Sequence, residues 1–135
     1  MSLDLVQRAL MEKMTTVLEG VPTAFENQPF VPPEGKHWAQ VHFVPNLPVI
    51  ETLGDQGQDL VDGFVQVDLN YPPGTGSAQA RQDFERIRAA LPGGSRLRYD
   101  GQEVVIRNVG RSQGRILNNW YRVYVTVSWY ALIPR

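Results

Sequence analysis

The segment "WYRVYVTVSWYAL", residues 120–132, constrains the fold more than any other part of the chain. Apolar residues occupy every second position from Tyr121 to Trp129, and mostly polar residues stand between them. This period of two is typical of a β-strand that buries one of its faces. A chain with such a strand has to build a sheet and then cover the apolar face of that sheet.

Two earlier segments show the same alternation, and we expect them to pair as a hairpin. They run from His37 to Val44 and from Val61 to Tyr71. Their connection, residues 46–59, has a Gly-rich tip but also contains apolar residues that a solvated loop does not need: Leu47, Val49, Ile50 and Leu53. This pattern predicts an antiparallel hairpin with an extended tip. A short strand is also expected at Thr23–Glu26.

The C-terminal part of the chain has the pattern of a β-meander. Strands are expected at residues 95–99 and 103–109, separated by Asp100–Gly101, a dipeptide that strongly favours a hairpin turn. A Gly- and Arg-rich loop is expected at residues 110–119, before the long final strand.

Two amphipathic helices complete the pattern. In the first, apolar residues recur at spacings of three and four, and Gly20 and Pro22 end it: Leu3, Val6, Leu10, Met14 and Val17. The second has Ala80, Phe84, Ile87 and Leu91 on one stripe and ends at Pro92–Gly94. The predicted fold is α+β, a largely antiparallel or mixed sheet of about four to six strands with both helices packed on one face.

Length and composition point to one domain over residues 1–135, without cysteine chemistry. The chain has 135 residues and no cysteine, which rules out disulfides and thiolate metal sites. Its N-terminus carries acids and lacks a continuous apolar stretch, and no apolar run reaches the length of a membrane helix. We therefore expect a soluble intracellular product that does not contact a membrane.

Charge is unevenly distributed along the chain. Residues 1–70 carry ten acids and three bases, for a net −7, whereas residues 71–135 carry ten arginines and four acids, for a net +6. If the fold keeps the halves apart, the molecule is a charge dipole that can pair head to tail with a copy of itself. The alternative is that the sheet interleaves the halves and averages the field.

The sequence Gly74-Thr75-Gly76-Ser77 resembles a phosphate-binding loop only superficially. No lysine follows it, and the third position of a dinucleotide fingerprint is Gln79 instead of Gly or Ala. The preceding strand alternates, whereas a buried parallel strand is apolar throughout. The structural interpretation is a strand stop at Pro72–Pro73, a glycine turn, and a helix capped by Ser77.

Metal and catalytic sites find no support in the sequence. His37 and His42 lie five residues apart on one strand, so their side chains point to opposite faces and cannot share a metal. Asp55, Asp59 and Asp62 do not have calcium-loop spacing and are interpreted as a solvated acidic loop. No Ser/His/Asp constellation is supported, and nothing selects one catalytic carboxylate pair from the fourteen acids. We expect no cofactor or metal.

Three arginines, Arg107, Arg111 and Arg115, are expected in or beside the loop that precedes the final strand, near Trp120 and Tyr124. Arginine interleaved with aromatic residues can bind a nucleic-acid backbone and stack bases. Arginine without lysine also suits ion pairs at protein interfaces. We favour a structural or protein-contact role and expect no specific nucleic-acid binding.

The pattern as a whole resembles the tail-terminator-like proteins of phages and prophages, also called minor tail protein U-like. The resemblance covers nearly the whole chain. It rests on the N-terminal helix, on "AFENQPFVPPEGKHWAQVHFVP" at 24–45, on "GFVQVDLNYPPGTGSAQA" at 63–80 and on "WYRVYVTVSWYA" at 120–131. Its most specific parts are Phe25-Glu26-Asn27 with Pro29-Phe30, and the turn Pro72–Gly76.

This resemblance implies a non-enzymatic structural role in the virion tail, with assembly in the host cytoplasm. Such proteins form a homo-oligomeric ring, commonly a hexamer, that ends growth of the tail tube and presents a surface to the head connector. The resemblance leaves open whether the ring forms from the isolated protein or only on assembly with the tail. Another neck or head-completion adaptor, or a small nucleic-acid-binding module, remains an alternative.

A ring requires two different complementary surfaces on each subunit. We predict that Leu47, Val49, Ile50 and Leu53 in the hairpin extension, together with Arg107, Arg111 and Arg115, contribute to them. Deletion of residues 46–57 is then expected to leave a folded monomer that no longer assembles.

Overall fold

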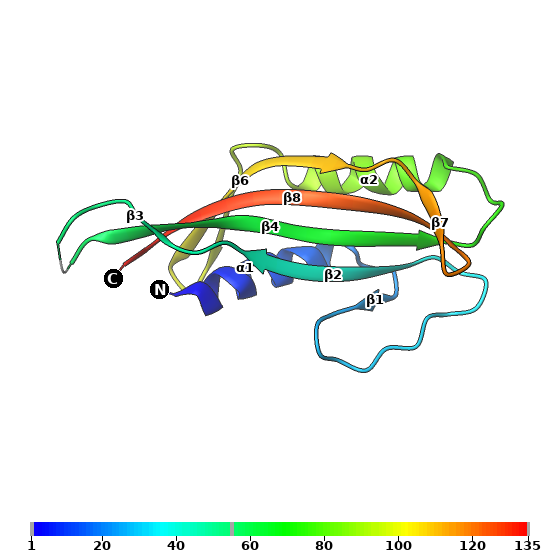
Figure 1. Ribbon diagram of the computed structural model, residues 1–135, viewed down its shortest axis with the longest axis horizontal. Helices are drawn as coiled ribbons and strands as arrows, with labels where there is room; N and C mark the ends of the chain where they lie inside the picture. The colour runs from blue at the N-terminus through cyan, green and yellow to red at the C-terminus, as the bar shows by residue number, and fades with distance from the viewer. Residues whose placement is uncertain (1, 55, 135) are drawn as a thin grey trace.

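The computed structural model describes residues 2–54 and 56–134 and consists of one long curved sheet with two helices (Figure 1). The helices are α1 (Leu3–Val17) and α2 (Ala78–Ala90). The strands are β1 (Thr23–Ala24), β2 (Trp38–Pro45), β3 (Val49–Ile50), β4 (Gln58–Tyr71), β5 (Arg96–Tyr99), β6 (Gln102–Arg111), β7 (Arg115–Leu117) and β8 (Trp120–Pro134).

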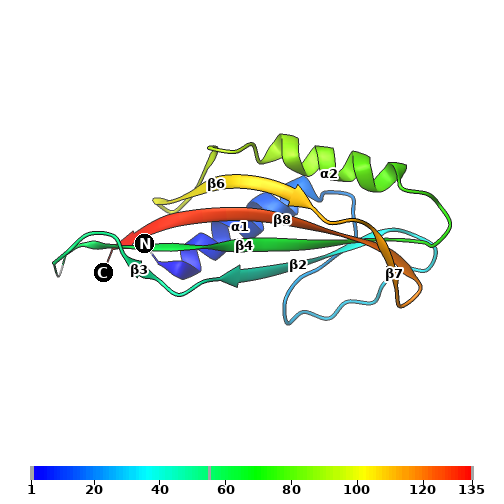
Figure 2. The same ribbon diagram turned by 45° about the horizontal axis from the view of Figure 1, so that its top comes forward.

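The strands are ordered β1-β2-β4-β8-β6-β5, with β3 paired to β4 and β7 paired to β8. Every pair is antiparallel except β1 with β2. The predicted α+β class with a largely antiparallel, mixed sheet is confirmed. The main path has six strands, and the two short additional strands lie at opposite ends of the molecule (Figures 1 and 2).

The long strands β4 and β8 form the centre of the sheet, as their alternation predicts. They pair without interruption from Gln58↔Pro134 to Tyr71↔Tyr121. Val65 and Val67 on β4 face the same side as Val125 and Val127 on β8, and all four are fully buried. Cross-strand pairs of this β-branched kind are the main local stabilisation of a sheet.

Both helices cover this apolar face, as predicted. The buried residues of α1, from Val6 to Val17, and those of α2, Ala80 and Ile87, belong to the same core cluster as the strand valines. Helix α1 contacts β5 and β6, and α2 contacts β6. Burying each such large side chain stabilises the fold by about 1.5–3 kcal/mol. The opposite face of the sheet carries neither helix.

Near the β3 end, the core is closed by an aromatic stack that requires a glycine. The rings of Phe43 and Trp129 are parallel within 7°, with centroids 5.4 Å apart. Gly63 lies beside them on β4, and a Cβ there would be 2.9 Å from Pro45 Cα and 3.1 Å from the Trp129 ring. Gly63 therefore allows β2 and the indole to approach the β4 backbone closely.

The predicted loop at 110–119 is wrong in part, because it contains the strand β7. Residues 115–117 pair with 120–122 through a two-residue turn at Asn118 and Asn119, whose φ angles are 50° and 65°. Two positive φ angles define the turn type that matches strand twist, and asparagine tolerates them. The predicted hairpin at Asp100–Gly101 is confirmed, with φ angles of 48° and 84°.

The predicted helix cap at Ser77 is also wrong. Ser77 occupies the N-cap position of α2, but its side chain accepts no hydrogen bond from the helix backbone. Its φ and ψ of −109° and 0° are not the extended conformation that aims a cap side chain at the first turn. The Ser77 hydroxyl instead accepts a hydrogen bond from the Arg81 guanidinium. At α1, Ser2 does cap, because Leu5 N donates to its Oγ over 3.2 Å.

The strand order separates the acidic and the arginine-rich halves within the sheet. β1, β2 and β4 come from the first half and lie on one side, whereas β8, β6 and β5 come from the second half and lie on the other. The strands are not interleaved, although α1 crosses over to contact β5 and β6.

Candidate assembly surfaces

The hairpin extension presents apolar side chains to solvent. The exposed fractions are 87% for Leu47, 60% for Val49, 64% for Ile50 and 91% for Leu53. Strand β3 holds Val49 and Ile50 against β4, so the extension is a ribbon with its own strand pairing. Asp55 lies outside the described residues. Exposed apolar side chains gathered on one element are typical of a protein-contact surface.

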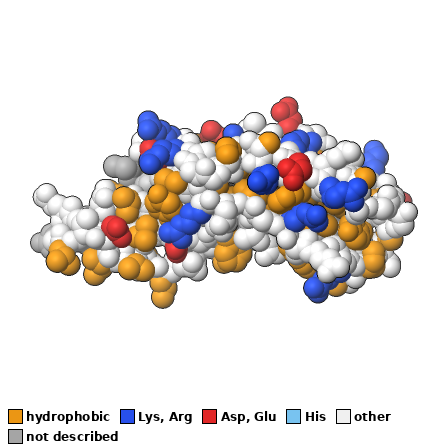
Figure 3. Space-filling model, turned by 90° about the horizontal axis from the view of Figure 1, so that it is seen from above, with side chains coloured by type: hydrophobic (Ala, Val, Ile, Leu, Met, Phe, Trp, Pro, Cys, Tyr) orange, Lys and Arg blue, Asp and Glu red, His pale blue; other side chains and the backbone are white. Residues whose placement is uncertain are grey.

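Figure 3 views the molecule from the side of β6 and α2 and shows a row of hydrophobic side chains at the end that carries β3. Lys and Arg side chains are spread over much of the remaining surface in this view.

The three predicted arginines do not form one patch. Arg107 and Arg111 lie on β6 and Arg115 lies on β7, and only residues 112–114 between the strands are loop. Arg111 places its guanidinium 5.6 Å from the centre of the Phe84 ring of α2, on the helix-covered face. Arg107 and Arg115 are on the open face, roughly 20 Å apart along β8 at about 3.4 Å per residue.

Arg107 is held by an ion pair that spans three strands. Its Nη1 lies 3.1 Å from Asp62 Oδ2 on β4, and its guanidinium lies 4.9 Å from the centre of the intervening Tyr130 ring on β8. A hydrogen bond from Asn46, and then the contact with Arg107, hold the pKa of the Asp62 carboxyl below its usual value. Arg107 therefore joins the two halves of the sheet and is less available for a phosphate backbone.

Two of the aromatic residues near the arginines, Trp120 and Tyr121, pack within the protein, whereas Tyr124 lies on the open face. Trp120 contacts Trp38 edge to face with ring centroids 5.9 Å apart, and Tyr121 lies 6.5 Å from Tyr71. Their rings are engaged in the fold rather than presented as a platform for bases. Arginines on two faces and engaged aromatics favour the protein-contact interpretation over nucleic-acid binding.

The two histidines lie on opposite faces, as their spacing predicts. His37 stacks on Tyr71 with centroids 6.0 Å apart on the helix side. His42 is on the open face, where its Nε2 lies 3.2 Å from Asp68 Oδ2. Over residues 2–54 and 56–134, no group of three or more His, Cys, Asp or Glu is arranged to hold a metal ion.

Sequence reasoning missed several buried polar contacts. Asp68, 4% exposed, accepts a hydrogen bond from Gln66 Nε2 over 2.8 Å on the open face, and next to it Asn70 accepts one from Arg122 Nε over 2.7 Å. Under α2, the Tyr71 hydroxyl donates to Asp83 Oδ2 over 2.6 Å. The alternation of apolar and polar residues predicts which face of the sheet each strand side chain is on, but it does not show which neighbouring side chains bury it.

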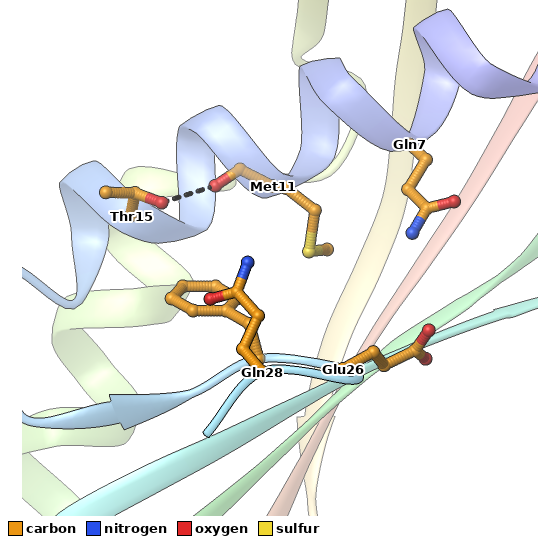
Figure 4. A pocket seen from close by; sticks show the side chains of 6 residues that line it. Gln7, Met11, Thr15, Glu26 and Gln28 are labelled. Atoms are coloured by element: carbon orange, nitrogen blue, oxygen red, sulfur yellow. Dashed lines mark hydrogen bonds between the residues drawn. The ribbon is translucent and has the colours of Figure 1, made fainter. Parts of the chain in front are cut away.

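One cavity of about 350 Å³ lies between α1 and the segment after β1 (Figure 4). Its polar side chains come from Gln7, Thr15, Glu26 and Gln28. The Thr15 hydroxyl already donates to Met11 O over 2.9 Å, and Glu26 Oε1 accepts the Phe43 backbone N–H over 3.1 Å. Because these two groups bind the backbone, the cavity offers no nucleophile paired with a base.

No helix within the described residues is long and apolar enough to cross a membrane. In the segment that resembles a phosphate-binding loop, Gly74 and Gly76 adopt φ angles of 83° and 81° and turn the chain. The Thr75 hydroxyl donates to Pro72 O over 2.9 Å, which closes this turn on itself.

Comparison with protein families matches residues 5–129 to the model described as phage tail terminator protein. Ten chains of solved structures also match. One of them, whose name indicates no function, shares 23% identity and a TM-score of 0.78, with 98% of this chain and 96% of the other covered. That likeness supports the fold. A comparison with curated proteins found no match.

Proposed function

Because the chain belongs to the phage tail terminator family and is therefore a structural component of a phage tail, we propose that it assembles into a ring that stops growth of the tail tube. The ring has six copies, as the sequence resemblance implies. Its two rims contact the last ring of the tube and the head connector, so that it also takes part in joining head and tail. Assembly takes place in the host cytoplasm, and the proposal assigns the chain no catalytic step.

The observation that carries this proposal is the exposed apolar extension. Leu47 and Leu53 are 87% and 91% exposed in the single chain, and such exposure costs free energy that a neighbouring protein can recover. The arginine-bearing strands β5 and β6 lie on the far side of the sheet from the extension, which supports the same proposal because it gives one subunit two unlike surfaces. A contact between two different surfaces produces a closed ring when the rotation that relates each subunit to the next adds up to one full turn.

Substitution tests the extension better than deletion does. Pro45 pairs with Gly63, whereas β4 begins at Gln58, so joining residue 45 to residue 58 would have to bridge roughly 17 Å at about 3.4 Å per residue. A deletion of 46–57 would therefore pull apart the end of β4. Polar substitution of the four exposed residues leaves the strands in place.

We predict that the quadruple variant Leu47→Ser, Val49→Thr, Ile50→Thr and Leu53→Ser folds as the parent does but fails to assemble. Folding is checked by circular dichroism, and assembly by light scattering alone and with purified tail tubes. A matched control is Val31→Ser, which changes an 87% exposed apolar residue outside the extension. Unchanged oligomers in the quadruple variant would show that the extension is not an assembly surface.

Electron microscopy of labelled tails tests the position of the ring. We expect the label at the head-proximal end of the tube, and tails of uncontrolled length when the protein is absent. A label within the neck, with tail length unaffected by loss of the protein, would favour the neck-adaptor alternative.

A further inference from the structure

The outer edge of β6 has a short open stretch. Ser112 N donates to Tyr124 O over 2.8 Å, and antiparallel hydrogen-bonded pairs alternate, so Gly110 and Asn108 also bond to β8. Val109 and Arg111 therefore point their N–H and C=O groups away from the sheet. Within the described residues, these outward groups have no hydrogen-bond partner.

The edge on either side of this stretch is covered. Ile106 is already paired on its outer side, since its N–H donates to Ser95 O and its C=O accepts from Gly94 N. Gly93 approaches Arg107 so closely that a Cβ there would lie 2.8 Å from the Arg107 carbonyl oxygen. Beyond Arg111 the chain leaves the edge for β7. The open stretch is therefore confined to Val109–Arg111.

The opposite edge of the sheet is closed along β2. Ala39 N donates to Pro22 O, and β1 pairs with β2 over two residues. Phe43 N donates to the Glu26 carboxylate over 3.1 Å, and Pro45 has no N–H to offer. Caps of this kind prevent pairing with another chain.

Strand β3, by contrast, has an outward backbone group. Glu51 N donates to Gln58 O, and hydrogen-bonded pairs alternate along an antiparallel ladder, so the N–H and C=O of the preceding residue, Ile50, point away from β4.

A groove of about 430 Å³ lies beside the open stretch, between β6 and α2. Its wall includes Ala89, Leu91 and Val109, which give it an apolar base. Arg88 also lines it, 3.7 Å from Glu85 on the same wall, and Arg111 lies nearby over Phe84. The groove thus combines unpaired backbone groups with apolar surface, and the positive charge of Arg111 lies beside it.

We propose that this edge receives the β3 extension of a second copy of the chain, so that β3 of one subunit pairs with β6 of the next. The extension has the complementary features: an outward Ile50 backbone, exposed apolar side chains and the acidic Glu51. Strand addition of this kind gains affinity from backbone hydrogen bonds and specificity from side chains in the adjoining groove. The inference rests on the proposed ring and names its interface.

The β3 extension and the β6 edge cannot contact each other within one chain. β3 pairs with β4, and β8 lies between β4 and β6, so the extension is on the far side of the sheet from its own β6 edge. The contact is therefore between copies and uses two different surfaces, which is the heterologous arrangement that a ring requires.

Disulfide trapping tests this contact directly, because the chain has no cysteine. The double variants Ile50→Cys/Arg111→Cys and Ile50→Cys/Gly110→Cys cover two neighbouring registers, and a Cβ at Gly110 meets nothing within 4 Å. The control is Ile50→Cys/Ile116→Cys, whose second position is 56% exposed on β7. Each variant is oxidised under conditions in which the parent assembles, alone or on tail tubes, and is separated on a denaturing gel.

We expect at least one β3–β6 double variant to give a ladder of linked chains longer than dimers. The yield of these species should be on the order of tenfold above the control, because the interface holds the two cysteines close together at a high effective concentration. Single-cysteine variants can give only dimers. Assembly seen by light scattering without such a ladder would overturn this interface while leaving the ring intact. No assembly of the parent under any condition would overturn the ring and this interface together.

A matched pair of variants separates backbone pairing from charge. Arg111→Pro removes the outward N–H and the guanidinium, whereas Arg111→Ala removes only the guanidinium. Proline is tolerated on an edge strand where the N–H faces solvent. With unchanged circular dichroism, we expect Arg111→Pro to weaken assembly at least several-fold more than Arg111→Ala. Equal assembly by the two variants would contradict strand addition at this edge.

Discussion

At the scale of single residues, the contact between Tyr71 and Asp83 fixes α2 on the sheet. The Tyr71 hydroxyl donates to Asp83 Oδ2 over 2.6 Å, and Gln79 Nε2 donates to Oδ1 over 2.9 Å. Asp83 is only 4% exposed, so its carboxylate depends on these donors and on Arg86, 3.7 Å away. A buried carboxylate that loses a donor pays a desolvation penalty.

Tyr71→Phe is expected to lower the free energy of unfolding at pH 7 by about 1–3 kcal/mol, because Asp83 loses a buried donor. Burial, and then the hydrogen bond to Asp83, raise the pKa of Tyr71 above its ordinary value of 10.0. The associated stability is present below pH 10 and is lost as pH rises through the folded-state pKa. Urea titration should therefore show a shallower alkaline decline for the variant than for the parent.

The control for this prediction is Tyr124→Phe, since the Tyr124 hydroxyl is on the open face and makes no hydrogen bond to the described residues. We expect it to change stability little. An equal loss in both variants would mean that the Tyr71–Asp83 bond contributes nothing specific.

At the scale of elements, turn chemistry decides where the short strands form. β7 exists because Asn118 and Asn119 adopt positive φ angles and return the chain onto β8. Its sequence alone, Arg115 to Leu117, is too short and too exposed to be predicted as a strand. β3 is similar, since its two exposed residues are held by pairing with β4.

Asn119→Val is expected to destabilise the β7–β8 hairpin by about 1–2 kcal/mol, because a β-branched residue is strained at a φ of 65°. Asn119→Gly, which is free of this strain, should be neutral or slightly stabilising. Hydrogen exchange of the amides of residues 115–117 measures the effect locally. Equal protection in the two variants would contradict the role assigned to this turn.

The long elements were predictable and the surfaces only partly so, for a physical reason. The strands around Val65 and Val127 and both helices repeat one period over many residues, and this repetition indicates which face is buried. The arginines at 107, 111 and 115 lack such a period. The faces of Arg107 and Arg111 depend on the β-bulge between Ile106 and Asn108, and the face of Arg115 depends on the pairing of β7 with β8. A bulge shifts register by one residue and so redirects side chains in a way that alternation alone does not reveal.

At the scale of the whole molecule, ion pairs fasten the two halves of the sheet and one of its edges. Asp62 on β4 pairs with Arg107 on β6 across β8. At the β5 edge, Glu103 contacts Arg96 and also Arg98, the latter at 3.0 Å. The hydrogen bond from Arg96, and then that from Arg98, hold the pKa of Glu103 below its usual value, as Asn46 and Arg107 do for Asp62.

These depressed pKa values predict that stability falls at acid pH. The contribution is present above the ordinary carboxyl values of 3.8 for Asp62 and 4.5 for Glu103, and it is lost as pH falls through the lower folded-state values. Urea titration between pH 7 and pH 3 measures it. Arg107→Gln should flatten the acid decline, and 0.5 M salt should weaken it because the pairs are exposed. An identical acid profile in parent and variant would contradict this assignment.

The position of β8 in the sheet has a consequence for how the chain folds during synthesis. β8 follows every other described strand in the sequence, yet it lies between β4 and β6 at the centre. The ribosome therefore releases the two flanking strands before the element that joins them, and the pairings span large sequence separations, which slows folding. We expect ribosome-bound chains ending before Trp120 to remain protease-sensitive, so that an unfinished copy does not have the complete sheet on which the proposed contacts between copies depend.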